Sequence, residues 1–340
     1  MAKTMTSREI VAATLDYTGP ERVARSFSPS DFVSAHTTAS TYATEWERVG
    51  APASEVWTRI DEWGNVWRRI DPTSKGEVAR GVLDDLDMIE SYEFPDFSRP
   101  EDYLAVREQR AGHPDRWLIG GLPGFAFNIA RKMRRFEQYL MDILLDRERI
   151  ARLHDRIDDT LESMIRNYAA AGVDAVMFPE DWGTQKQTLI SPRLWRQEFF
   201  PRFARLCDVA HESGIKVFMH SCGQIQGIVP GLIEAGIDLL QFDQPDLHTL
   251  DLLEARQKEA RAQDKTITFW CPVDIQITLQ TKDRATIEEK AREMLDRLWR
   301  GEGGFVAGYY GDNASIGLDP IWQDYASAAF VGYGVRSRYR

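Results

Sequence analysis

Residues 175–223 read AVMFPEDWGTQKQTLISPRLWRQEFFPRFARLCDVAHESGIKVFMHSCG and contain the pattern that decides the fold. Two short apolar runs, Ala175 to Phe178 and Lys216 to Met219, stand on either side of a stretch with helical periodicity, Pro192 to Ser213. Gly214 follows that stretch, where a helix end needs a residue in the left-handed conformation. A strand, a crossover helix and a second strand form a βα unit, in which the strands run parallel.

The same alternation extends from about Trp117 toward the end of the chain. Further strands are predicted at Trp117 to Gly120, Asp238 to Phe242, Thr266 to Trp270 and Gly304 to Ala307. Further helices are predicted at Arg149 to Ala170, Ile225 to Ala235 and Ile287 to Trp299. No G-x-G-x-x-G motif follows an early strand, which disfavours an open doubly wound sheet. We therefore predict an α/β fold of the (β/α)8 TIM barrel type, and 340 residues fit one such domain.

The first 85 residues carry a different pattern. Thr6-Ser7-Arg8-Glu9 is a capping box, which predicts a short helix through about Leu15. Between Val56 and Ile70 the residues alternate in polarity around Gly64-Asn65, which predicts a β-hairpin. We expect a single domain over residues 1–340, with an N-terminal helix and hairpin segment at 1–85 outside the barrel wall and the barrel at 86–340.

Composition excludes several classes of protein. The net charge is −11 and the basic residues are dispersed, so we expect no nucleic-acid partner. No run of about 18 apolar residues occurs, so we expect no membrane span. Cys207, Cys222 and Cys271 are too few for a disulfide framework, and the start MAKTMTSREI lacks an apolar signal region. These features predict a cytoplasmic protein.

The segments after the predicted strands are rich in chemically active residues, and barrel enzymes build their active sites from these loops. The loops lie at 120–125 (GGLPGF), 178–183 (FPEDWG), 219–223 (MHSCG), 241–245 (QFDQP), 270–274 (WCPVD) and 308–313 (GYYGDN).

His220-Ser221-Cys222 is the most specific of these motifs. Side chains two apart on an extended segment point the same way, so an imidazole and a thiolate could bind one zinc ion. Cys271 closes another strand and could be a third ligand, and Glu180 or Asp181 could offer a carboxylate from a third loop. A packed histidine beside a buried thiol is the simpler alternative.

Other loop residues are candidates for catalysis or substrate contact. We expect catalytic roles for Glu180, Asp181, His220 and Asp243, with Asp243 orienting the histidine. We expect substrate contacts from Trp182, Trp270, Tyr309, Tyr310 and Asp312. The acids could instead cap helices, and the tyrosines could fill the barrel top.

Arg131, Lys132, Arg134 and Arg135 form a basic cluster after the loop at 120–125. Such a cluster is usually a solvated helix face, and contact with an acidic partner is the alternative.

Several segments together resemble the uroporphyrinogen decarboxylase superfamily. The central resemblance covers Leu189 to Pro192, Lys216 to Gly223 and Leu232 to Gly236, and supporting segments are Thr6 to Glu9, Pro20 to Val23, Asp61 to Gly64 with Trp67, and Gly303 to Phe305. The hairpin is similar to one in the methyltransferase-like branch. Nearly the whole chain is covered, and the order and spacing of the segments are more specific than any one of them.

The resemblance implies one of two activities. Decarboxylases of the superfamily carry an Arg-Gln-Ala-Gly-Arg segment near the N-terminus and a histidine near the last strand, whereas this chain reads VARSFS at 23–28 and YYGDN at 309–313. The methyltransferase branch holds zinc through His-x-Cys and a further cysteine after the last strand. His220 and Cys222 match the first two positions, but Tyr310 or Gly311 stands in place of the third. A complete site would need Cys271, Glu180, Asp181 or a substrate group.

We therefore expect a methyltransferase or O-demethylase component that moves a methyl group between a small molecule or thiol and a corrinoid (cobalamin), with zinc at His220 and Cys222. The alternatives are a metal-free decarboxylase or lyase acting on a carboxylated or tetrapyrrole-like substrate, and a non-catalytic corrinoid or tetrapyrrole binder. The expected partners are a small-molecule substrate, a corrinoid protein and a second copy of the chain in a homodimer.

Overall fold

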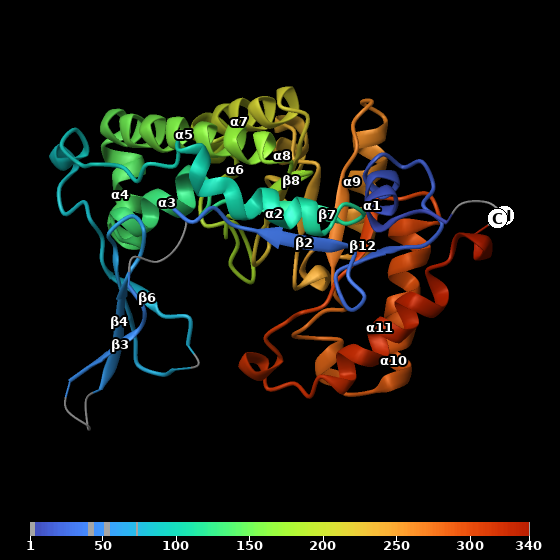
Figure 1. Cartoon of the computed structure of the whole chain (residues 1–340). Coiled ribbons are helices and arrows are strands. Elements are labelled where there is room, and N and C mark those ends of the chain that lie inside the picture. Colours follow the sequence, from blue (N-terminus) through green and yellow to red (C-terminus); the bar gives the residue numbers. More distant parts are fainter. Residues whose placement is uncertain (1–3, 40–43, 51–54, 73, 340) are drawn as a thin grey trace.

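The computed structural model describes residues 4–39, 44–50, 55–72 and 74–339. Its centre is an eight-stranded parallel sheet that curls into a nearly closed barrel with helices around it (Figure 1). The strand order is β1-β12-β11-β10-β9-β8-β7-β2. The strands are β1 (Ala24–Arg25), β2 (Phe32–Ala35), β7 (Trp117–Gly121), β8 (Ala175–Pro179), β9 (Lys216–His220), β10 (Leu239–Gln241), β11 (Thr268–Cys271) and β12 (Phe305–Ala307). The predicted (β/α)8 barrel is confirmed.

The barrel seam lies between β1 and β2, the two ends of the strand order. The amide of Asp31 donates to the carbonyl of Arg25 at 3.0 Å, and the amide of Arg25 donates to the Asp31 carboxylate at 2.8 Å. Arg22 forms an ion pair with the same carboxylate at 2.6 Å. Both strands belong to residues 1–85, so the expectation that this segment lies outside the barrel wall was wrong. The strands have two and four residues, which is too short to give a recognisable apolar period.

Helix α1 (Ser7–Leu15) covers one end of the barrel. Thr6 and Glu9 form the predicted capping box. Ile10, Val11 and Leu15 belong to the same apolar cluster as the inward-facing strand residues. Those inward residues include Ala24, Phe32, Trp117, Ile119, Ala175, Phe218, Leu239 and Val306. They alternate along their strands with residues that pack against the outer helices, as the two-residue period of a strand requires.

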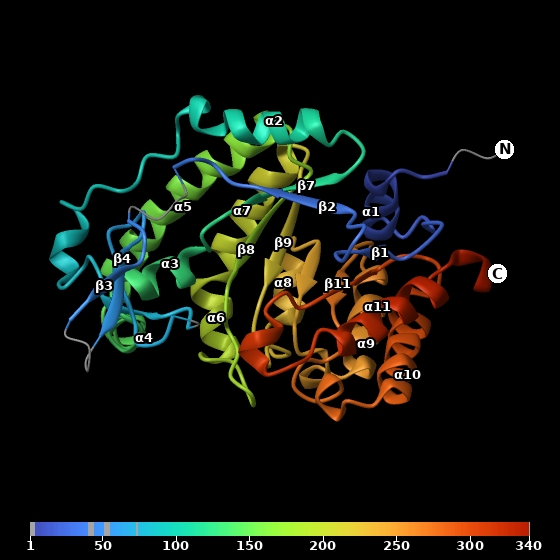
Figure 2. The ribbon, with the colours of Figure 1, turned by 60° about the horizontal axis from the view of Figure 1, so that its bottom comes forward.

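The remaining helices surround the sheet, and Figure 2 shows the C-terminal helices grouped near α1. They are α2 (Leu104–Gly112), α3 (Ala126–Met133), α4 (Phe136–Leu145), α5 (Arg147–Ala170), α6 (Pro192–Glu198), α7 (Phe200–Glu212), α8 (Val229–Ala235), α9 (Leu250–Arg261), α10 (Arg284–Met294) and α11 (Ile321–Tyr333). Within the described ranges, none of the helices has the length and apolar character needed to cross a membrane.

Two predicted helices differ in detail from the structure. The stretch from Pro192 to Ser213 is divided at Phe199, because Pro201 has no amide proton to donate back to the preceding turn. The last predicted helix starts at Arg284 as α10 and ends in a wider π turn over Leu295–Trp299.

A separate four-stranded antiparallel sheet lies beside α3 and α4 (Figures 1 and 2). Its strands are β3 (Glu47–Val49), β4 (Val56–Ile60), β5 (Val66–Arg69) and β6 (Glu77–Arg80). Strands β4 and β5 are the predicted hairpin. Gly64 adopts φ 85° in the turn, and the carboxylate of Asp61 accepts bonds from the amides of Trp63 and Asn65.

Candidate active site at the carboxyl ends of the strands

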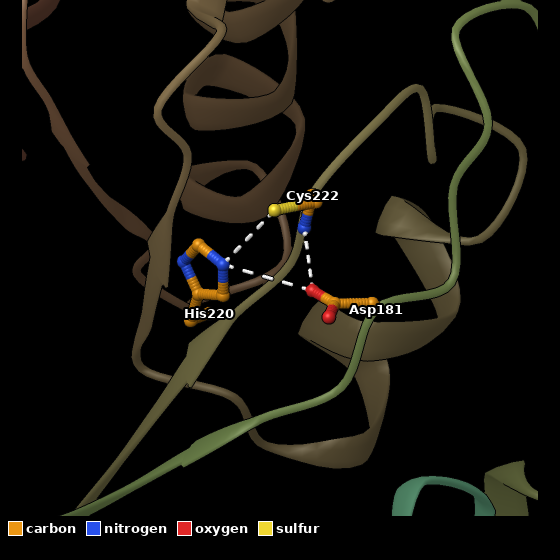
Figure 3. Close-up of side chains that lie close together, drawn as sticks. All are labelled: Asp181, His220 and Cys222. Atoms are coloured by element: carbon orange, nitrogen blue, oxygen red, sulfur yellow. Dashed lines mark hydrogen bonds and ion pairs between the residues drawn. The ribbon is translucent and has the colours of Figure 1, made fainter. Parts of the chain in front are cut away.

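Three potential metal-binding side chains meet at the mouth of the barrel (Figure 3). His220 ends β9, Cys222 follows it by two residues, and Asp181 lies in the loop after β8. The Nε2 atom of His220 lies 3.3 Å from Cys222 Sγ and 3.6 Å from Asp181 Oδ1. One donor atom from each residue falls within 4.8 Å of the other two, so the three could coordinate one ion.

The adjacent strands β8 and β9 bring these residues together. Pro179 pairs with His220, and the Glu180 amide donates to the His220 carbonyl at 2.9 Å. The loops then stay in contact, since Gly183 and Gly223 approach so closely that a Cβ atom on either would come within 2.5 Å of the other's backbone. The amide of Cys222 donates to Asp181 Oδ1 at 3.0 Å. The cluster is therefore positioned by backbone contacts.

Gln241 and Asp243 determine which nitrogen of His220 faces the cluster. Asp243, when ionised, can only accept, so the Gln241 amide nitrogen must donate to it at 2.8 Å. The amide oxygen of Gln241 then faces Nδ1 of His220, with which it forms a hydrogen bond. Nδ1 therefore carries a proton, and Nε2 faces Cys222 and Asp181, where the neutral form of the imidazole offers a lone pair to a bound cation.

Charges around the cluster affect the two other donors in opposite directions. Burial alone would raise the pKa of Asp181, but His220, the Cys222 amide and Arg131 outweigh it and lower the pKa. Desolvation and the carboxylates of Asp181 and Asp243 raise the pKa of Cys222 to about 12. Without a nearby cation the thiol is therefore protonated near neutral pH. A divalent cation would reverse this effect.

Two predicted metal ligands lie elsewhere. The side chain of Glu180 is fully buried, and its Oε1 accepts from the amides of Phe125 and Asn128 at 2.6 and 3.1 Å, at the start of α3. Burial raises its pKa to about 8. Cys271 is fully buried in the outer core cluster, because its neighbour Trp270 faces the barrel interior. Among the described residues, the donor group contains neither residue, and Asp181 supplies the third donor.

Asp243, predicted to orient the histidine, contacts it through Gln241, a residue that we did not single out. The position of Gln241 in the sheet could have identified it, because Gln241 pairs with His220 in the ladder between β9 and β10.

The aromatic residues predicted to contact substrate lie in different environments. Trp182 is completely buried and stacks on Phe127 at 4.0 Å, so the prediction that it faces a ligand was wrong. A tryptophan in a strand-end loop can turn outward as easily as inward. Trp270 faces the barrel interior and stacks on Phe32 at 4.7 Å.

Residues 309–313 form the loop after β12. The side chains of Tyr309 and Tyr310 are half-buried, and the Tyr310 backbone exchanges hydrogen bonds with Gln323 at 2.7 and 2.8 Å. Asp312 caps a short 3-10 helix by accepting from the Ser315 amide. Their contact with substrate stays a prediction.

A cavity of about 250 Å³ opens beside His220. Its wall is mainly apolar and includes Ile119, Leu122 and Met177, with Ser34 and His36 as polar residues. An adjoining cavity of about 340 Å³ shares His36 and Leu122 and extends toward the four-stranded sheet. We did not predict a role for His36, because it follows the short strand β2.

The family model described as uroporphyrinogen decarboxylase matches residues 70–309, which include the whole donor cluster. Among solved structures, the chain is similar to a methyltransferase from Methanosarcina mazei, with a TM-score of 0.59 and 14% identity over 96% of this chain and 85% of that one. It is also similar to a B12-independent methionine synthase from Shewanella sp. W3-18-1, with a TM-score of 0.42 and 12% identity over 84% and 74%. No curated protein matches the chain. At these identities the likeness to solved structures concerns the fold alone.

Proposed function

The chain belongs to the uroporphyrinogen decarboxylase family, and on this premise we propose that it is a methyl-transfer enzyme that holds a zinc ion through Asp181, His220 and Cys222. The observation that carries the proposal is the meeting of these three side chains at the barrel mouth, next to a cavity. The decarboxylase alternative has no comparable support, since the sequence lacks the arginine segment and the late histidine of that branch.

The donor set fits zinc by its chemistry. Zinc accepts nitrogen, sulfur and oxygen donors, and catalytic zinc sites combine three protein ligands with one open position. His220 offers the Nε2 lone pair, and Asp181 carries a lowered pKa that keeps it ionised. Asp181 thus takes the place of the third cysteine that the methyltransferase branch has after its last strand.

A bound zinc ion supplies positive charge that deprotonates a coordinating thiol near neutral pH. The protein residues have separate tasks around it. Gln241, held by Asp243, fixes the orientation and tautomer of His220. The apolar wall formed by Ile119 and Met177 lines the space beside His220, where a methyl-bearing group would be placed.

We propose a corrinoid as the second methyl carrier, delivered by a partner protein or taken up directly. The resemblance to the methyltransferase branch supports this assignment. Methyl transfer to a thiol would break the cobalt–carbon bond, form a carbon–sulfur bond and leave the electron pair on cobalt. A small thiol or a methylated small molecule is the substrate at the other end of the reaction, and a homodimer in the cytoplasm is the expected state.

Metal analysis tests the zinc site directly. Untagged protein should contain about one zinc per chain after reconstitution and dialysis. Asp181→Ala, His220→Ala and Cys222→Ser should each lose the metal, because each removes one of three protein ligands. Cys271→Ser is the matched control and should retain it, since that thiol is buried away from the cluster. Wild-type protein without zinc, or loss of zinc in Cys271→Ser, would contradict the proposed site.

Consumption of methylcobalamin tests the reaction separately. In the presence of a thiol, wild-type protein should change the visible spectrum of methylcobalamin as the methyl group is removed. The three ligand variants should leave that spectrum unchanged. Zinc-loaded protein that is inactive with a panel of thiols would refute thiol-directed transfer and leave the metal site intact.

A further inference from the structure

A third cavity, which we call the cationic groove, lies between the four-stranded sheet and helices α3 and α4. Its volume is about 550 Å³. The residues that matter here are four cations and two aromatic side chains: Arg68, Arg131, Lys132, Arg135, Trp67 and Phe136. Strand β5, helix α3, the α3–α4 junction and helix α4 each contribute, so residues from separate parts of the sequence build the groove.

Most of these cations lack a partner of opposite charge. Within the part of the chain that the structure describes, Arg68, Lys132 and Arg135 form no ion pair, whereas most other arginines do. Two exposed carboxylates, Glu77 and Glu137, also line the groove but form no ion pair with them. The groove is lined by four cations and two carboxylates. Asp181 pairs with Arg131, and the charges of Asp61 and Glu62 act on Lys132, so Arg68 and Arg135 are the cations best placed to meet a bound anion.

The basic cluster seen in the sequence is divided by the fold. Arg134 points away from the groove and binds Asp142 at 2.8 Å and the carbonyl of Leu83 at 2.6 Å. Its role is structural. The other three members line the groove, where Arg131 and Lys132 are half-buried and Arg135 is exposed.

Lys132 is held in an unfavourable state that an anion would relieve. Burial, and next the charge of Arg131, lower the pKa of Lys132. Its ammonium group lies 5.7 Å from the Trp67 ring.

The groove is connected to the barrel mouth. Trp67 and Lys132 line both the groove and the adjoining 340 Å³ cavity, which in turn shares His36 with the cavity at His220. Arg131 lies 3.6 Å from the carboxylate of Asp181. A ligand in the groove would therefore reach toward the donor cluster.

We propose that the cationic groove binds the anionic head, phosphate or carboxylate, of a small organic molecule whose body packs on Trp67 and Phe136. A volume of about 550 Å³ fits an organic ligand better than a single inorganic ion. Guanidinium groups match phosphate and carboxylate oxygens through paired hydrogen bonds. The inference does not depend on methyl transfer or on zinc.

Isothermal titration calorimetry with three probes tests the groove: ADP, benzene-1,3,5-tricarboxylate and uncharged adenosine. We expect ADP, the tricarboxylate or both to bind with a Kd on the order of 0.1 mM at low salt, weakening at high salt, and adenosine not to bind. Binding of ADP alone identifies phosphate as the preferred head, and binding of the tricarboxylate alone identifies carboxylate. Absence of millimolar binding by both anions overturns the proposal.

Paired substitutions locate the site. The double variant Arg68→Glu and Arg135→Glu changes two exposed residues and should weaken anion binding at least about tenfold. The double variant Arg107→Glu and Arg193→Glu is the control, because it changes the net charge equally at exposed positions outside the groove, and it should leave the affinity unchanged. Equal affinity in both double variants would show that the anions bind elsewhere and would overturn the proposal.

Discussion

At the scale of single residues, the site depends on a short chain of hydrogen bonds behind His220. Asp243 fixes the Gln241 amide, Gln241 fixes the imidazole, and the imidazole presents Nε2 to the cluster. Support of this kind raises the affinity of a histidine for a metal by limiting its orientations and its tautomers. Gln241 is a positioning residue in this arrangement.

Gln241→Leu removes the acceptor for the Nδ1 proton while keeping the size of the side chain. We expect the zinc affinity to fall by about 10- to 100-fold, because the imidazole loses its fixed orientation. Competition with a chromogenic chelator measures this change. Gln244→Leu, in the same loop, is the matched control and should bind zinc as the wild type does, since the Gln244 side chain contacts Gln185 and not His220.

Gln241→Glu separates orientation from simple damage to the fold. A glutamate still accepts from Nδ1 but cannot donate to Asp243, so zinc affinity should recover in part relative to Gln241→Leu. Equal affinity in the wild type and Gln241→Leu would show that the hydrogen-bond chain does not support the metal.

At the scale of elements, strands β5 and β6 form one wall of the cationic groove, and Asp61 organises the turn between β4 and β5. This side chain is buried and accepts four bonds, two of them from side chains: Asn65 Nδ2 at 3.0 Å and Trp67 Nε1 at 2.7 Å. It therefore fixes Trp67 where the groove and the adjoining cavity meet.

Asp61→Ala should destabilise the four-stranded sheet by about 2–4 kcal/mol, because it leaves several buried donors without an acceptor. Hydrogen exchange of the β4 and β5 amides, together with urea unfolding, measures the loss. Asp84→Ala changes an exposed carboxylate and should have little effect. Unchanged exchange in Asp61→Ala would mean that the turn is held by its backbone alone.

The elements of the regular strand–helix alternation could be predicted from the sequence, and the strands outside it could not. Strands β8 to β12 have apolar runs that stand between predicted helices. Strands β1 and β2 do not, and they are defined by pairing with β12 and β7, which are distant in the sequence. His220 and Cys222 could be paired because two-residue spacing fixes their common direction. Strand register decides whether Glu180 or Asp181 faces the donor cluster. It also decides whether Cys271 or Trp270 faces the barrel interior, and the sequence does not specify this register locally.

At the scale of the whole molecule, buried histidines such as His248 should make the stability depend on pH. His248 is 1% exposed, stacks on Phe242 at 4.1 Å and shares a hydrogen bond with Gln226 at 3.1 Å. Burial lowers its pKa from 6.5 to about 4. Between these values the unfolded chain binds more protons than the folded chain, so the free energy of unfolding falls as the pH falls through this window.

His248→Phe keeps the stacking and removes the titration. The wild type should lose about 3 kcal/mol more than this variant between pH 6.5 and 4, measured by urea unfolding at several pH values. His113→Phe replaces an exposed histidine and should follow the wild type. Parallel stability curves for the wild type and His248→Phe would show that His248 is protonated without cost in the folded state.

The seam between β1 and β2 has a consequence for the order in which the chain can fold during synthesis. Strand β1 is made before the other barrel strands, but its ladder partner β12 is made after all of them. Strands β7 to β11 can pair with a neighbour as each appears, whereas the facing edges of β1 and β11 stay open until β12 has been made. Open strand edges are sites of aggregation, so a ribosome that stalls before Phe305 would release a chain with an unclosed barrel. Helix α1, which is synthesised first, would then cover the apolar interior of an incomplete wall.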